Sequence, residues 1–139
     1  GVRGALSGYQ KGHCFYCLRE FSLSGSALPD VDHFFPHRLK AIGVGRVVDG
    51  VWNLVLACTR CNRGTSGKFD RVPTLELLER LHTRNEFLIG SQHPLRETLQ
   101  AQTGPTELER IAFLRAFHIA ARTALLHEWQ PNESGAPMF

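Results

Sequence analysis

The sequence contains no apolar run close to the ~20 residues that a membrane-spanning helix needs. Its N-terminus has no basic segment followed by an apolar stretch, which argues against a signal peptide. Charged residues make up only 21% of the chain and hydrophobic residues 42%, a composition that excludes disordered, collagen-like and coiled-coil classes. Internal repeats and low-complexity tracts are also lacking. These absences predict a cytoplasmic, globular protein with no membrane partner.

The 139 residues fit one globular domain large enough to bury a hydrophobic core. Because the chain begins with Gly1 rather than Met, we expect a piece of a larger protein with further domains. The net charge of +3 is uneven: residues 1–70 hold nine Lys/Arg against five Asp/Glu, and residues 71–139 hold seven against eight. A polyanionic partner would therefore meet the first half, although so small an excess does not by itself decide for nucleic acid.

The cysteines form two C-x-x-C pairs, Cys14 with Cys17 and Cys58 with Cys61. Two such pairs on separate turns can place four thiolates at the corners of a tetrahedron, the geometry of structural Zn²⁺ sites. The alternatives are two disulfides or four buried thiols without a metal. Disulfides would need an oxidising compartment, which nothing in the sequence indicates. The spacing therefore predicts structural Zn²⁺.

Hydrophobic periodicity predicts an α+β fold. We expect a helix at 3–12, a hairpin at the first cysteine pair, strands at 31–35 and 53–57, a basic glycine-containing connection at 36–50, and a helix from 59 towards 68. Thr74 and Thr106 are expected to begin two further helices, the second with a capping box to Glu109. On that second helix the apolar stripe is assigned to Leu108, Ile111, Ala112, Arg115, Ile119, Arg122, Leu126 and Trp129. The predicted organisation is a zinc-braced core at 1–73, a helical extension packed on it at 74–130, and a flexible tail at 131–139.

Four polar residues stand where the predicted strands and helix meet: Asp32, His33, Asn53 and Asn62. A carboxylate and an amide oxygen suit a hard cation such as Mg²⁺ or Mn²⁺, and they indicate Asp32 and Asn62 as its ligands. An imidazole titrates near neutrality, so His33 can take a proton from an attacking water. Turn capping by Asp32 or Asn62 and a packed His33 are the alternative readings.

These residues lie in a recognisable order: Val31-Asp32-His33-Phe34-Phe35-Pro36, then Asn53-Leu54-Val55-Leu56-Ala57, then Cys58-x-x-Cys61-Asn62-Arg63-Gly64 with Lys68. Over about residues 10–73 the chain resembles the HNH endonucleases in their zinc-braced form. The resemblance implies a ββα-metal core, also called the His-Me finger. It also implies His33 as general base and Asp32 and Asn62 as ligands of a catalytic Mg²⁺ or Mn²⁺. Asn53 is implied as the second catalytic residue, which braces the loop and orients the base. Many members have histidine at the position of Asn62. An asparagine there resembles the nuclease domains of RNA-guided CRISPR effectors, which lack the zinc cysteines.

A group of basic residues near this constellation is expected to contact DNA phosphates; it comprises His37, Arg38, Lys40, Arg46, Arg60, Arg63 and Lys68. For any one of them, a solvated surface charge is the alternative. The sequence thus predicts an enzyme that hydrolyses phosphodiester bonds, most readily of double-stranded DNA, with restriction or phage defence as its expected role. RNA as substrate, a non-catalytic zinc module that binds nucleic acid, and a homodimer remain open.

Overall fold

The computed structural model describes residues 2–22, 28–43, 47–137 and 139. These residues form a mixed α+β fold with five α-helices, two 3₁₀ helices and two small two-stranded sheets. The elements, in chain order, are α1 (Val2–Gln10), β1 (Asp30–His33), η1 (His37–Lys40), η2 (Val51–Asn53), β2 (Leu54–Ala57), α2 (Thr59–Arg63), β3 (Val72–Pro73), α3 (Leu75–Gly90), α4 (Arg96–Thr103), α5 (Glu107–Ala124) and β4 (Glu128–Trp129). None of the helices in the described ranges is both long and apolar enough to cross a membrane.

Strands β1 and β2 pair antiparallel, with Asp32 opposite Val55, and α2 follows β2 after one residue. The strand–strand–helix order therefore agrees with the order that the sequence predicts. Helix α1 is tied to β2 because the buried side chain of Gln10 bonds both the N–H and the C=O of Leu56. Strand β1 ends at His33, two residues earlier than expected; the N–H of Phe34 still donates to the carbonyl of Asn53, and its ring is buried.

Helix α2 has only five residues, and Gly64 ends it. A Cβ at Gly64 would lie 2.7 Å from the carbonyl oxygen of Arg60, so only glycine fits this turn. The following turn returns the chain, and the N–H groups of Lys68 and Phe69 then donate to the carbonyls of Cys61 and Asn62. The expected continuation of the helix towards Lys68 is wrong, because the chain folds back at this glycine.

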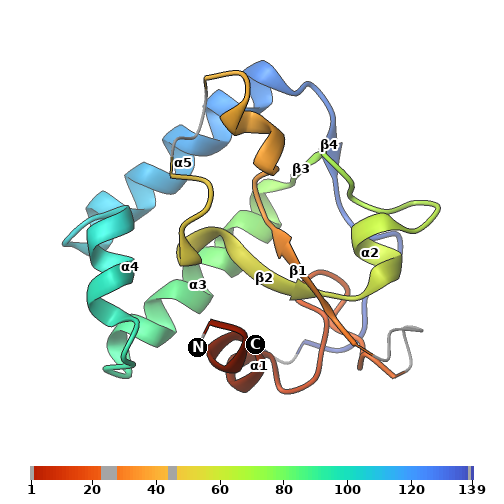
Figure 1. Ribbon diagram of the computed structural model, residues 1–139, viewed down its shortest axis with the longest axis horizontal. Coiled ribbons are helices and arrows are strands. Elements are labelled where there is room, and N and C mark those ends of the chain that lie inside the picture. Colours follow the sequence, from red (N-terminus) through yellow and green to blue (C-terminus); the bar gives the residue numbers. More distant parts are fainter. Residues whose placement is uncertain (1, 23–27, 44–46, 138) are drawn as a thin grey trace.

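Helices α3, α4 and α5 lie together on one side of the β1–β2 pair, and α2 lies on the other (Figure 1). One hydrophobic core runs through both parts. The fully buried guanidinium of Arg84 on α3 donates to the carbonyl oxygens of Val51, Trp52 and Leu54. Burial lowers the pKa of Arg84 to about 10. Because these carbonyls belong to η2 and β2, α3 holds the segment that leads into the first sheet.

Helix α5 begins as predicted, since Thr106 Oγ1 accepts the N–H of Glu109. The predicted buried face of α5, however, is wrong, because Leu108 is 80% exposed and Ile119 is 68% exposed. The buried face includes Leu114 and Phe117, whose ring lies 5.2 Å from that of Trp52. Both faces carry apolar residues, and the aromatic face buries the larger area. The helix ends at Ala124, and Trp129 lies in β4, which pairs with β3 in parallel.

Described residues after Pro131, where the sequence predicts a flexible tail, contact the rest of the chain. The N–H of Gly135 donates to the carbonyl of Cys17, and Glu133 forms an ion pair with Arg19 at 2.8 Å. The ring of Phe139 stacks on that of Phe15 and contacts Tyr9. The C-terminal segment is thus held against the first cysteine turn and α1 by contacts that its sequence gives no means to anticipate.

Candidate functional site

Cys14, Cys17, Cys58 and Cys61 form a buried cluster whose sulfur atoms all lie within 4.8 Å of one another. No disulfide joins them. Burial raises the pKa of Cys14, whereas a hydrogen bond with Cys14 lowers that of Cys17 to about 7. Four sulfurs this close would repel one another as thiolates, so a cation between them is favoured. The cluster can hold a metal such as zinc, which fits the predicted site.

Both cysteine turns are shaped by main-chain hydrogen bonds. The N–H of Leu18 donates to the carbonyl of Cys14, and Leu18 takes a left-handed φ of 64° to close the turn. In the second turn the N–H of Asn62 donates to the carbonyl of Cys58 within α2. Asn62 therefore follows directly on a cluster cysteine and is the fourth of the five residues of α2.

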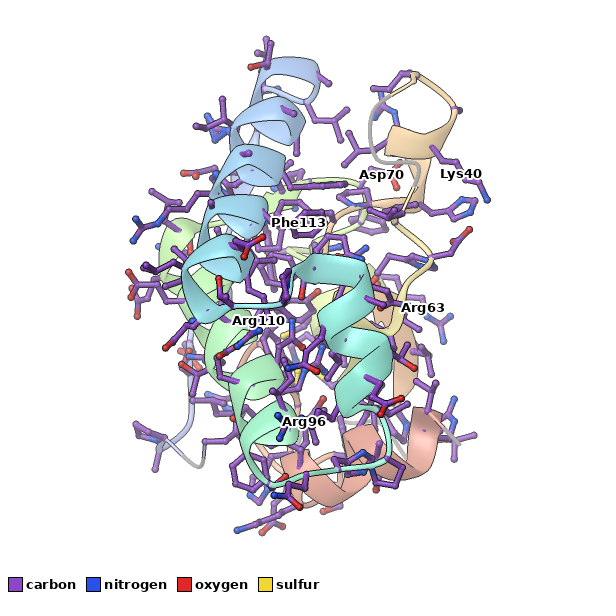
Figure 2. The ribbon with its side chains drawn as sticks, turned by 90° about the vertical axis from the view of Figure 1, so that its left-hand side faces the viewer. Lys40, Arg63, Asp70, Arg96, Arg110 and Phe113 are labelled. Carbon is purple, nitrogen blue, oxygen red and sulfur yellow. The ribbon has the colours of Figure 1, made fainter. Side chains whose placement is uncertain are left out.

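The sequence-predicted site residues meet at a second place, a cavity of about 260 Å³ between β1, α2 and the turn after it. Its lining includes Asp32 and His33 from β1, Asn62 from α2, and Lys68 and Asp70 from the returning turn. Side chains of adjacent strand residues point in opposite directions. Both Asp32 and His33 nevertheless line the cavity, because β1 ends at His33. Figure 2 shows Asp70, Lys40 and Arg63 along one side of the molecule.

Asp32 lies at the floor of this cavity and is 9% exposed. Its Oδ2 accepts the hydroxyl of Tyr16 at 2.6 Å and lies 3.2 Å from the ammonium of Lys68. That ammonium also donates to the carbonyl of His33 at 2.8 Å. Burial lowers the pKa of Lys68, and the opposing charge of Asp32 acts against this shift. The ion pair with Lys68 neutralises the carboxylate of Asp32, which the sequence predicts to be a metal ligand.

His33 is oriented by Asp49, a residue of the connection before η2. Its Nε2 lies 3.1 Å from Asp49 Oδ1, and Nε2 of His37 lies 3.3 Å from the same oxygen. Hydrogen bonds from Lys40 and His33 lower the pKa of Asp49, which keeps it ionised. An ionised carboxylate only accepts hydrogen bonds, so Nε2 of His33 carries the proton. In the neutral ring Nδ1 then keeps its lone pair.

Asn53 is fully buried and braces the loop, the role that the resemblance implies. Its Oδ1 accepts the N–H of Phe35 at 2.7 Å, and its Nδ2 donates to the carbonyls of Phe35 and Val48, each at 2.9 Å. It thus joins the end of the β1 segment to the residue before Asp49. The position of Asp49 beside His33 depends on this amide.

Asn62 is held by Asp30 at the start of β1. Its Nδ2 donates to Asp30 Oδ2 at 3.0 Å, and the Nε of Arg63 donates to the same oxygen. The hydrogen bond of Arg63 lowers the pKa of Asp30. Since the carboxylate can only accept, it fixes which end of the Asn62 amide is the nitrogen. The amide oxygen is left on the side away from Asp30.

The basic residues predicted to contact DNA are not equivalent in the structure. Arg38, Lys40, Arg60 and Arg63 are exposed, and so is His37. The prediction that Lys68 contacts DNA is corrected. Its side chain is fully buried against Asp32, so it is not one of the surface cations. Arg46 lies outside the described residues.

Sequence reasoning missed Asp49, Asp70, Tyr16 and Asp30, each of which belongs to this region of the fold. Asp30 is two residues before Asp32, so a strand places both on the same face, a signal that could have found it. The other three approach from turns whose paths no local pattern reveals.

A further group of potential metal ligands comprises His82, Glu86 and Glu107, within 4.8 Å of one another. Both oxygens of Glu86 accept hydrogen bonds from Arg110, at 2.7 and 2.8 Å. Glu107 lies in the first turn of α5, where the helix dipole disfavours a cation. The group is therefore explained as an ion-pair cluster between α3 and α5.

No family model matches the chain, and no curated protein or solved structure is similar enough to count as a match. The function must therefore be argued from the two sites themselves.

Proposed function

We propose that this chain is a metal-dependent endonuclease of the HNH type that hydrolyses DNA phosphodiester bonds, in keeping with the resemblance over residues 10–73. The observation that carries the proposal is the polar cavity in which Asp32, His33 and Asn62 meet beside a buried cysteine cluster. In this proposal β1, β2 and α2 form a ββα-metal core, and zinc at the four cysteines anchors α2. Restriction or phage defence is the expected role.

His33 is the proposed general base. The contact of its Nε2 with Asp49 leaves Nδ1 to accept a proton from water. The water oxygen then forms the new bond to phosphorus, the bond from phosphorus to the 3′ oxygen breaks, and that oxygen leaves as the 3′-hydroxyl after taking a proton. The products are a 3′-hydroxyl and a 5′-phosphate, as the resemblance implies.

The residues fit a loosely held Mg²⁺ or Mn²⁺. Asp32, Asn62 and Asp70 place two carboxylates and one amide around the cavity, the oxygen donors that such ions prefer. Tyr16 and Lys68 both contact Oδ2 of Asp32, and Nδ2 of Asn62 donates to Asp30. The proposed ligand atoms are therefore the other carboxylate oxygen of Asp32 and the amide oxygen of Asn62. When bound, the ion would stabilise negative charge on the phosphate and on the leaving oxygen.

A second candidate function is a non-catalytic zinc module that binds nucleic acid. The ion pair between Lys68 and Asp32 favours it, because a neutralised carboxylate attracts a divalent cation less strongly. Under this alternative the cavity has no hydrolytic role, and only the basic surface is used.

The two candidates are separated by nicking of supercoiled plasmid with the zinc-loaded full chain, with and without added Mg²⁺ or Mn²⁺. The endonuclease proposal expects nicking that requires the added ion, is lost in His33→Ala and persists in His127→Ala, a control at an exposed histidine. Equal nicking by His33→Ala would overturn the proposed mechanism. No nicking by any form, with DNA still bound, would favour the non-catalytic module.

A further inference from the structure

Three cavities follow one another around α2, and they share lining residues. The candidate catalytic cavity is lined in part by Arg63. Arg63 also lines a second cavity, of about 570 Å³, together with Arg60 and Thr65. Arg60 and Thr65 in turn line a third cavity, of about 410 Å³, beside the cysteine cluster. The shared residues join the three into one track, from the candidate catalytic cavity across the outer side of α2 to the first cysteine turn.

The chemistry of this track suits a phosphodiester backbone. Arg63, Arg60 and Arg19 follow one another along it, and Thr65 and Ser66 add hydroxyl groups. Arginine is the side chain best shaped to hold phosphate oxygens. Within the described part of the chain Arg60 makes no ion pair, so its charge is not compensated by a neighbour.

The far end of the track is covered by the C-terminal segment. Pro131, Asn132 and Glu133 line the third cavity, and Glu133 Oε2 lies 2.8 Å from Nη2 of Arg19. The hydrogen bond from the N–H of Gly135 to the carbonyl of Cys17 fixes the segment there. A carboxylate on an arginine occupies the position that a phosphate oxygen would take.

We propose that one strand of a nucleic acid lies along this track, with Arg63, Arg60 and Arg19 on successive parts of its backbone, and that Glu133 competes with the strand for Arg19. The proposal deepens the proposed function and rests on it in treating the strand as substrate. It assigns Arg19, a residue outside the sequence-predicted basic group, to nucleic-acid binding. It also gives the C-terminal segment a restraining role.

The test is fluorescence anisotropy of a labelled DNA oligonucleotide, single-stranded and as a duplex, titrated with the zinc-loaded full chain carrying His33→Ala. On this background Arg60→Ala is expected to weaken binding about fivefold and to reduce the slope of log affinity against log salt by about one. Glu133→Gln is expected to strengthen binding, because Arg19 is released. The matched control is Arg115→Ala, which removes an exposed arginine of α5 and should change neither value. Helix α5 and α2 lie on opposite sides of the β1–β2 pair (Figure 1).

The competition is tested by combining the two end variants. If Glu133 acts through Arg19, then Glu133→Gln gives no gain in an Arg19→Ala background. A gain of the same size in both backgrounds would overturn the competition. Equal affinities of Arg60→Ala and Arg115→Ala would overturn the track.

Plasmid nicking with His33 intact keeps this inference separate from the proposed function. Ion-dependent nicking together with an unaffected Arg60→Ala variant would refute the track and leave the endonuclease standing. Weakened binding in Arg60→Ala without any nicking would support the track and refute the endonuclease.

Discussion

Replacing each of the two asparagines of the site by alanine is predicted to have different effects on the stability of the chain. Asn53 makes three buried hydrogen bonds, to the N–H and C=O of Phe35 and to the C=O of Val48. Asn62 makes one side-chain hydrogen bond, to Asp30; this bond is only partly buried, and Asp30 keeps Arg63 as a partner. Asn53→Ala should therefore lower the free energy of unfolding, and Asn62→Ala should leave it nearly unchanged.

The size of the change in the free energy of unfolding follows from the number of hydrogen bonds lost. Each net hydrogen bond contributes about 1 kcal/mol, and main-chain groups left unpaired in the interior add about 1–3 kcal/mol. Phe35 and Val48 are fully buried, so water does not readily replace the amide. Together these give about 4–6 kcal/mol for Asn53→Ala, a large share of the stability of a domain of this size. For Asn62→Ala the loss is about 1 kcal/mol or less.

The assay is urea unfolding of the zinc-loaded chain, followed by the fluorescence of Trp52 and Trp129, beside plasmid nicking at a temperature at which both variants are folded. Asn53→Ala should unfold at much lower urea. Asn62→Ala should unfold near wild type and lose ion-dependent nicking. A loss below about 1 kcal/mol for Asn53→Ala, or equal losses for both variants, would refute the assignment of bracing to Asn53.

Four further predictions follow. Asp49→Asn can present its amide nitrogen to His33, so nicking should fall about tenfold to a hundredfold while the melting temperature changes little; an unchanged rate would show that Asp49 does not orient the ring. Lys68→Met leaves the Asp32 charge buried and unpaired and should destabilise the chain by about 3 kcal/mol, a loss that adding Asp32→Asn should largely reverse in the same urea assay; additive losses would count against the pair. Removal of metal with a chelator should release one zinc per chain and unfold the cysteine turns, seen by metal-indicator absorbance and circular dichroism, with Cys58→Ala unable to reload; metal release with no structural change would contradict the anchoring role. Phe117→Ala should cost about 3–5 kcal/mol and Ile119→Ala less than about 0.5 kcal/mol, and the reverse order would restore the face of α5 that the sequence predicts.

The sequence predicts the parts of the fold that depend on local pattern. The paired C-x-x-C spacing anticipates the cysteine cluster, since two tight turns with cysteines three residues apart leave few other arrangements. The Thr106 to Glu109 capping box is predicted as well, because it is complete within one helical turn. The convergence of Asp32, His33 and Asn62 on one cavity also follows from the order of strands and helix.

What escapes prediction depends on contacts between distant segments. Helix α5 has apolar residues on both faces, so periodicity alone cannot select the face with Phe117, which contacts Trp52 from the other half of the chain. Lys68 is taken for a surface cation because lysine is seldom buried, and its burial depends on the ion pair with Asp32 and on the hydrogen bond to the carbonyl of His33. The C-terminal segment carries no helical or strand pattern, and its place depends on bonds to Arg19 and Cys17 and on the contacts of the Phe139 ring with Phe15 and Tyr9.

The cysteine cluster and the candidate catalytic cavity are connected through α2 and the turn that follows it. Cys58 and Cys61 lie at the start and in the middle of α2, and Asn62 is the next residue. The N–H of Lys68 donates to the carbonyl of Cys61, so the same cysteine also sets the turn that brings the ammonium to Asp32. A metal in the cluster therefore fixes Asn62 and Lys68 relative to β1 without touching a substrate. It follows that a structural metal and a catalytic one can be told apart by what their removal does: loss of the first should disturb both sites, and loss of the second should leave the fold unchanged.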